Sequence, residues 1–124
     1  MTIIALADKL PELERLIQMI EAESPQAEVW GFSQTKSARE CIERVGCDVL
    51  FVDVILQDAS GLEFAKEIME LNPEVNVIFT AESTSFANAA FQLYASGYIT
   101  KPLTPQKVAK ELHELRYTKI SESV

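Results

Sequence analysis

The sequence predicts a three-layer, doubly wound α/β sandwich in which parallel strands alternate with helices. Five short β-rich segments recur along the chain, at Thr2–Ala7, Ala27–Phe32, Asp48–Val52, Val75–Thr80 and Tyr98–Thr100, and segments with helical periodicity separate them. Alternation of strand and helix implies parallel strands joined by right-handed crossovers. The third and fourth β segments are apolar on both faces, as expected of central strands that helices cover on each side.

Local signals at their ends predict the first three helices. The first covers Pro11–Glu23, because proline suits a first helical turn, and the second covers about Lys36–Val45. The third starts with the capping-box sequence Ser60-Gly61-Leu62-Glu63 and runs toward Leu71, where Asn72-Pro73 ends it. The residues expected to face the core are Leu13, Leu16, Ile17 and Ile20 in the first helix and Ala38, Cys41, Ile42 and Val45 in the second.

The last two helices follow the fourth and fifth strands. We expect one over about Thr84–Ala95, ended by Gly97, and another that begins at Thr104-Pro105 and has Val108, Leu112 and Leu115 on one side. The fourth helix also carries several aromatic residues. Phe86, Phe91 and Tyr94 cannot all point inward if Ala89, Ala90 and Leu93 form its core face. An exposed aromatic residue there would suit a dimer or effector interface.

Length and composition restrict the class of protein. The 124 residues are 48% hydrophobic, so the chain is expected to form one domain whose core needs no disulfide. A formal net charge of −8 argues against binding of nucleic acid or of an anionic membrane by this segment. No apolar run reaches the roughly 18 residues that span a bilayer. The spacing of Cys41 and Cys47 matches no metal or redox motif, and we expect reduced thiols in a cytoplasmic protein.

Polar residues stand at the ends of four predicted strands. Asp8 follows the first strand and Asp53 the third, Thr80 ends the fourth, and Lys101 follows the fifth. In a doubly wound sheet the functional crevice lies outside the carboxyl ends of the strands. Each residue alone has an ordinary explanation, such as a helix cap for Asp8 or a turn for Asp53. Their joint position at the strand ends favours one pocket that holds two carboxylates, a hydroxyl and an ammonium.

This set of groups suits phosphoryl transfer to a carboxylate. Two nearby carboxylates repel each other unless a cation lies between them, and hard oxygen ligands suit Mg²⁺. An aspartate carboxylate can attack phosphorus and form an acyl phosphate. A metal ion and a lysine would stabilise charge on the phosphoryl oxygens, and a threonine hydroxyl could hydrogen-bond the product.

From about Thr2 to Tyr117 the sequence resembles the receiver domain of bacterial two-component response regulators. Asp53–Gly61 is similar to the phosphoacceptor loop of that family, Val77–Ala81 to its switch-threonine strand, and Gly97–Pro102 to its lysine–proline segment. The order and spacing of the three motifs carry the resemblance. It implies a flavodoxin-like (βα)5 fold with a parallel five-stranded sheet in the order 2-1-3-4-5.

The resemblance implies a role for each residue around the phosphoacceptor. Asp53 would accept a phosphoryl group from a histidine kinase, and Lys101 would contact that group. Asp8, Asp53 and the backbone carbonyl of Ile55 would bind Mg²⁺. The family usually has an acidic pair after the first strand, but Ala7 occupies one of the two positions here. We therefore expect weak Mg²⁺ binding and slow phosphorylation.

The resemblance also implies a switch. Thr80 would move to bond the phosphate, Tyr98 would rotate inward behind it, and the Lys101–Pro102 bond would be cis. Gln57 replaces the proline that usually follows the phosphoacceptor by four residues, so the loop is expected to be more mobile.

A receiver domain is a signalling domain and takes part only in its own phosphorylation and dephosphorylation, so we expect no other enzymatic activity. Ala87–Tyr98 and Lys101–Tyr117 are similar to receivers attached to DNA-binding effectors, particularly the LytTR-like group. Residues 1–118 are expected to form the receiver, and residues 119–124 a tail or the start of a linker to an absent effector domain. The fourth helix, fifth strand and fifth helix are the expected contact surface for a homodimer or an effector.

Three alternatives use a related fold. A pseudo-receiver would act as a phosphorylation-independent interaction module, and Ala7 is the main argument for it. A flavodoxin-like electron carrier needs a hydroxyl- and glycine-rich loop after the first strand, where this chain has Ala7-Asp8-Lys9-Leu10-Pro11. A phosphatase of the haloacid-dehalogenase type needs a second aspartate two residues after the nucleophile, and Ile55 occupies that position.

Overall fold

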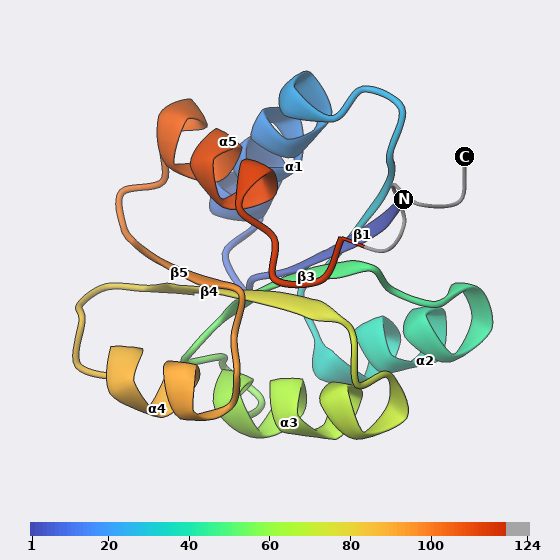
Figure 1. Cartoon of the computed structure of the whole chain (residues 1–124), viewed down its shortest axis with the longest axis vertical. Helices are drawn as coiled ribbons and strands as arrows, with labels where there is room; N and C mark the ends of the chain where they lie inside the picture. Colours follow the sequence, from blue (N-terminus) through green and yellow to red (C-terminus); the bar gives the residue numbers. More distant parts are fainter. Residues whose placement is uncertain (119–124) are drawn as a thin grey trace.

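The computed structural model describes residues 1–118, in which five parallel strands form one sheet with helices on both faces (Figure 1). The strands are β1 (Thr2–Leu6), β2 (Glu28–Phe32), β3 (Val49–Asp53), β4 (Asn76–Ala81) and β5 (Gly97–Thr100). Their order is β2-β1-β3-β4-β5, and every neighbouring pair is parallel, which confirms the predicted fold and strand order. The predicted tail or linker at residues 119–124 lies outside the described residues.

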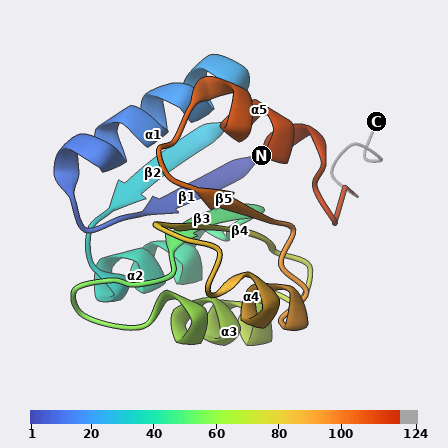
Figure 2. The same ribbon diagram turned by 90° about the vertical axis from the view of Figure 1, so that its left-hand side faces the viewer.

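Helices make up the two outer layers. They are α1 (Leu10–Glu23), α2 (Thr35–Val45), α3 (Gly61–Leu71), α4 (Ala87–Gln92) and α5 (Pro105–His113). Figures 1 and 2 show α1 and α5 on one face of the sheet and α2, α3 and α4 on the other. Within residues 1–118, no helix is long and apolar enough to cross a membrane.

The core has two parts, one on each face of the sheet. Phe51 packs with Leu16 on the face that α1 and α5 cover, and Phe79 packs with Phe64 on the other. Every residue of β3 and β4 is buried, as the apolar sequences of these strands predict. Full burial of one such aromatic or aliphatic side chain contributes about 1.5–3 kcal/mol. Both cysteines are free and buried, and burial raises the pKa of the Cys47 thiol to about 12, so this thiol stays protonated.

Helix α4 is shorter than predicted, because local hydrogen bonds replace its first turn and a backbone turn ends it early. The Ser83 side chain accepts a hydrogen bond from the backbone N–H of Ser85, which competes with helix formation. At the other end Tyr94 has a φ of 62°. The N–H groups of Tyr94 and Ala95 donate to the carbonyls of Phe91 and Ala90, which is the pattern of a Schellman cap.

Three of the sequence expectations near helix ends were therefore wrong. Tyr94, and not Gly97, has the left-handed conformation that ends α4, and Gly97 is the first residue of β5. Ala89 is exposed and Ala90 is buried, so only the second of these two alanines belongs to the core face of the shortened helix. Val45 is also exposed, at 39%, because α2 ends there and Gly46, with a φ of 83°, redirects the chain.

A buried asparagine anchors the segment after α5 to the amino end of β4. Asn76 is 1% exposed. Its side-chain amide donates to the carbonyl of Tyr117 over 2.9 Å, and its side-chain oxygen accepts from the backbone N–H of Tyr117 over 2.7 Å. The same oxygen accepts from the hydroxyl of Ser96, also over 2.7 Å. The chain beyond α5 is thus fixed at the end of the sheet opposite to the carboxyl ends of the strands.

Candidate functional site

The strand register brings three of the predicted site residues together. Asp53 lies opposite Thr80 in the β3–β4 pair, and Ala81 lies opposite Thr100 in the β4–β5 pair. Lys101 directly follows β5 and donates its backbone N–H to the carbonyl of Ala81 over 2.8 Å. The Lys101–Pro102 peptide bond is cis, as expected. Asp53, Thr80 and Lys101 therefore lie together at the carboxyl edge of the sheet, which confirms their predicted positions.

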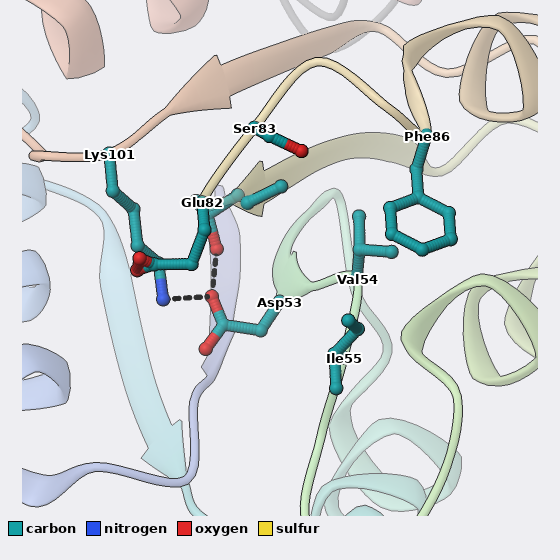
Figure 3. Close-up of a pocket in the computed structure, with 9 residues that line it drawn as sticks. Asp53, Val54, Ile55, Glu82, Ser83, Phe86 and Lys101 are labelled. Carbon is teal, nitrogen blue, oxygen red and sulfur yellow. Dashed lines mark hydrogen bonds and ion pairs between the residues drawn. The ribbon is translucent and has the colours of Figure 1, made fainter.

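Two neighbouring groups hold the Asp53 carboxylate by the same oxygen. The hydroxyl of Thr80 donates a hydrogen bond to Oδ1 of Asp53, and Nζ of Lys101 lies 3.3 Å from that oxygen. Figure 3 shows both contacts, with the second carboxylate oxygen turned away from them. Neither contact uses Oδ2, so this oxygen is the one available to attack an electrophile.

The surroundings of Asp53 act on its charge in opposite directions. Asp53 is 4% exposed, and burial raises the pKa of its carboxyl above the ordinary value. The hydrogen bond from Thr80 and the positive charge of Lys101 lower that pKa, while the negative charge of Glu12 raises it. Lys101 and Thr80 therefore support the ionised form, which is the form that can act as a nucleophile.

Lys101 forms a second ion pair, with Glu12 at the third position of α1. Its Nζ lies 2.7 Å from Oε1 of Glu12, closer than to Asp53. Burial lowers the pKa of Lys101, but the two carboxylates outweigh this effect, so the pKa is raised and the ammonium is charged. Sequence reasoning missed Glu12. The available signal was that a first helical turn after β1 lies at the same edge of the sheet as the strand ends.

The loop between β3 and α3 is held against the strands by its backbone. The N–H of Val54 donates to the carbonyl of Thr80 over 2.9 Å, and the N–H of Gly61 donates to the carbonyl of Val54 over 2.7 Å. A Cβ atom on Gly61 would lie 1.8 Å from the carbonyl oxygen of Asp53. Glycine is therefore required eight residues after Asp53, because any side chain there would displace the backbone beside the pocket.

Asp58 ties the same loop to the start of α2. Its Oδ2 accepts hydrogen bonds from both the backbone N–H and the hydroxyl of Thr35, each over 3.1 Å. Ser60 caps α3 by accepting from the backbone N–H of Glu63, which confirms the predicted start of this helix. The hydrogen bonds of Asp58 thus restrain this loop, in which Gln57 replaces the expected proline.

The proposed metal donors lie around two neighbouring hollows. Asp8 and Ile55 line one of about 300 Å³, and Asp53 and Ile55 line the other, of about 90 Å³. Among residues 1–118, no group of three or more His, Cys, Asp or Glu side chains could hold a metal ion. A cation here would depend on two carboxylates, one carbonyl, and water or phosphate, a donor set that suits Mg²⁺. The roles of Asp8 and Ile55 stay predictions.

The loop between β4 and α4 connects the pocket to Tyr98. Ser83 and Phe86 line the smaller hollow together with Asp53 and Thr80 (Figure 3). The hydroxyl of Tyr98 donates to the carbonyl of Ser83 over 2.7 Å, and its half-buried ring packs against the core on the α2–α4 face. Sequence reasoning missed Ser83 and Phe86, since nothing in their local sequence places them beside Asp53.

The sheet order and the three residues at its carboxyl edge define a class of signalling domains. Within this class, the chain belongs to the response regulator receiver domain family, because the family model matches residues 4–113. Receiver domains of response regulators take part in two-component phosphorelays.

The chain is similar to part of two curated proteins named LytR. The sensory transduction protein LytR of Staphylococcus saprophyticus is 38% identical over 68 residues, which cover 55% of this chain and 27% of that protein. The transcriptional regulatory protein LytR of Staphylococcus aureus is 28% identical over 101 residues, which cover 77% of this chain and 41% of that protein. The matched region thus spans less than half the length of these relatives. Their names agree with the resemblance to LytTR-like receivers.

Solved structures show the same fold. The response regulatory domain of protein mrkE from Klebsiella pneumoniae superposes with a TM-score of 0.85 at 23% identity, over 100% of both chains. A CheY-like response regulator receiver domain protein from Methanospirillum hungatei gives a TM-score of 0.79 at 23% identity, over 98% of this chain and 94% of that one.

Proposed function

We propose that this chain is a receiver that accepts a phosphoryl group on Asp53 from a histidine kinase and then changes a surface that a partner recognises. One observation carries the proposal: Thr80 and Lys101 hold Oδ1 of Asp53 and leave Oδ2 free of these contacts. The chain would catalyse no reaction other than its own phosphorylation and dephosphorylation.

In the proposed reaction, Oδ2 of Asp53 attacks the phosphorus of a phosphohistidine. An O–P bond forms as the N–P bond breaks, and the imidazole nitrogen leaves with the bonding electron pair. Lys101, which is charged, would neutralise charge on the phosphoryl oxygens. In dephosphorylation, water attacks phosphorus, the O–P bond breaks, and the carboxylate and inorganic phosphate are released.

Mg²⁺ is the cation that the donor set suits. Asp8, Asp53 and the carbonyl of Ile55 would hold it, and when bound it would supply positive charge to the phosphoryl oxygens. We propose that binding is weak, because Ala7 provides no second carboxylate at the end of β1.

Phosphorylation would alter the bonding of Thr80. The modification adds about 1.5 to 2 negative charges and three strong acceptor oxygens. A neutral hydrogen bond contributes only about 1 kcal/mol, whereas a shift of a population from 1:99 to 99:1 needs about 5.5 kcal/mol. Thr80 alone cannot supply this difference, so Lys101 and a rearrangement of Tyr98 with the β4–α4 loop must contribute. The bond between Tyr98 and Ser83 supports this route.

Two exposed aromatic residues support an interface on the side of α4. Phe91 is 54% exposed and Tyr94 is 65% exposed, and the guanidinium of Arg116, beyond α5, lies 5.1 Å from the centre of the Tyr94 ring. We propose that α4, β5 and α5 form the contact surface for a second copy or an effector domain.

Incubation with Mg²⁺ and acetyl phosphate, followed by intact-protein mass spectrometry, tests the phosphoacceptor. The mass should rise by one phosphoryl group in the wild type and not in Asp53→Asn. Asp58→Asn is the matched control, because Asp58 lies in the same loop but binds Thr35, and it should still be modified.

The same experiment decides between a receiver and a pseudo-receiver. Absence of any mass gain in the wild type, with both acetyl phosphate and a phosphorylated histidine kinase, would favour the pseudo-receiver. Modification of Asp53→Asn at the wild-type level would place the phosphoryl group on another residue.

Analytical ultracentrifugation with and without beryllofluoride, a phosphoryl mimic, tests the interface. Phe91→Ser should weaken self-association if the surface includes α4. Leu71→Ser is the control, because Leu71 is 58% exposed at the end of α3, away from this surface.

A further inference from the structure

Glu12 reaches the pocket from α1, a different layer from the strands that carry the other site residues. Its Oε1 lies 2.7 Å from Nζ of Lys101, whereas Oδ1 of Asp53 lies 3.3 Å from the same nitrogen. The side chains of Glu12 and Lys101 are only 21% and 14% exposed. Exposed ion pairs are weak and poorly fixed in space, but this pair is largely shielded from water. Its geometry is therefore well defined.

A lysine in this position needs a second partner to stay in place. Its ammonium is a strongly hydrated point charge at the end of a flexible four-carbon stem, so a single contact restricts it little. The end of β1 provides no carboxylate at position 7, where Ala7 is 2% exposed. The closest carboxylate to Lys101 comes from the helix that follows.

An acidic residue at position 12 has a simpler explanation, the helix dipole, but this explanation does not account for the contact between Glu12 and Lys101. Acidic residues in a first helical turn interact favourably with the positive end of the helix dipole. That effect requires no particular side-chain direction. Glu12 instead contacts a residue 89 positions away in the sequence, on the segment that follows β5.

We infer that Glu12 is a positioning residue that holds the Lys101 ammonium beside Asp53. Lys101 then lies between two carboxylates and is fixed at the point where a phosphoryl group would arrive. The consequence for phosphoryl transfer rests on the proposed function of Asp53, but the positioning of Lys101 does not.

Variants of Glu12 and Glu14 distinguish the positioning of Lys101 from the general effect of a negative charge on α1. Glu12→Ala should slow phosphorylation of Asp53 by acetyl phosphate roughly ten- to a hundredfold, by analogy with the loss measured when the hydrogen-bond partner of a metal ligand is removed. Glu12→Gln keeps the length and an acceptor oxygen and should retain part of the rate. Glu14→Ala is the matched control, because it removes an exposed carboxylate from the same helix, and its rate should equal that of the wild type.

The test also compares the effects of Glu12→Ala on the maximal rate and on the half-saturating concentration of acetyl phosphate. A misplaced Lys101 weakens stabilisation of the transferring group, so the maximal rate at saturating acetyl phosphate should fall more than the half-saturating concentration rises. Equal maximal rates for the wild type, Glu12→Ala and Glu14→Ala would overturn the inference.

A second readout needs neither Mg²⁺ nor phosphoryl transfer. Carbon-13 relaxation of the Lys101 ε-methylene group reports whether the side chain is held. The group should be ordered in the wild type and in Glu14→Ala and mobile in Glu12→Ala, while amide spectra confirm that each variant is folded. If the wild type accepts no phosphoryl group, the proposed function fails, and this measurement alone decides the role of Glu12. An ordered methylene group in Glu12→Ala would overturn the inference.

Discussion

Thr80 and Asp53 lie opposite each other on β4 and β3, and the threonine hydroxyl donates a hydrogen bond to the carboxylate before any modification. Thr80 is 2% exposed, so its side chain has little freedom. In the proposed reaction, the hydroxyl would exchange a carboxylate oxygen for a phosphoryl oxygen attached to the same residue. The first step of the switch is then a change of bonding partner over a short distance.

Removal of this hydroxyl should change the titration of Asp53. In Thr80→Val the shape is nearly kept, but the hydrogen bond that lowers the pKa of Asp53 is lost, so that pKa should rise further. The pH dependence of the Asp53 carboxyl carbon shift measures it. Thr100→Val on β5 is the control and should leave the titration unchanged. The same titration in Thr80→Val and the wild type would show that the hydroxyl does not act on the carboxylate.

Asp53→Asn should stabilise the protein at neutral pH. Burial raises the pKa of Asp53, so between the unfolded and folded pKa values the native state binds more protons than the unfolded state. The contribution of Asp53 to stability is therefore fully present below the unfolded pKa and is lost as the pH rises through the folded pKa. Asparagine carries no charge and avoids this loss, and the gain should be about 1 kcal/mol.

Urea unfolding at several pH values measures this difference. The advantage of Asp53→Asn over the wild type should shrink as the pH falls and the aspartate becomes protonated. An advantage that stays constant down to acidic pH would have another origin.

Two glycines should respond to alanine for different reasons. In Gly61→Ala the new Cβ meets the Asp53 carbonyl oxygen at 1.8 Å, so the backbone must move at a cost of about 1–3 kcal/mol. In Gly46→Ala the Cβ meets nothing within 4 Å, and the cost of about 1–3 kcal/mol comes from the backbone conformation alone, since a φ of 83° with a ψ of −177° is adopted almost only by glycine.

Thermal unfolding and phosphorylation kinetics separate the two glycine variants. Gly61→Ala should lower both stability and the rate of modification of Asp53, because the displaced backbone belongs to the pocket. Gly46→Ala should lower stability only. A normal modification rate in Gly61→Ala would mean that the loop adjusts without disturbing Asp53.

Asn76→Ala should release the segment after α5. The variant removes both hydrogen bonds between this side chain and the backbone of the half-buried Tyr117, and each such bond contributes about 0.5–1.5 kcal/mol. Hydrogen exchange at the Tyr117 amide should accelerate far more than exchange in the central strands. Lys110→Ala, at an exposed position on α5, is the control. Unchanged protection of Tyr117 in Asn76→Ala would show that other contacts hold the segment.

The central part of the site could be predicted because strand order and strand ends determine it. Asp53, Thr80 and Lys101 stand at the carboxyl ends of neighbouring parallel strands, so their proximity follows once the strands are recognised. Strand order alone does not locate Glu12, because its contact with Lys101 depends on the side-chain direction of a helix. The sequence indicates only that the first turn of this helix lies at the same edge of the sheet.

The end of α4 was wrongly predicted for a conformational reason. Glycine is the usual residue in a left-handed helix cap, and Gly97 was the nearest glycine. Tyr94 takes that conformation instead, although a side chain makes it unfavourable. Its ring lies beside Arg116, a contact from a distant part of the chain that no local pattern reveals.

Because Asn76 anchors Tyr117, β4 links the segment after α5 to the pocket at its other end. The strand carries Asn76 at its first residue and Thr80 four residues later, a separation of about 13 Å at the usual rise of a strand. Hydrogen bonds to β3 and β5 on either side make this short span stiff. The strand therefore keeps the pocket residue Thr80 and the Asn76–Tyr117 anchor at a fixed distance from each other.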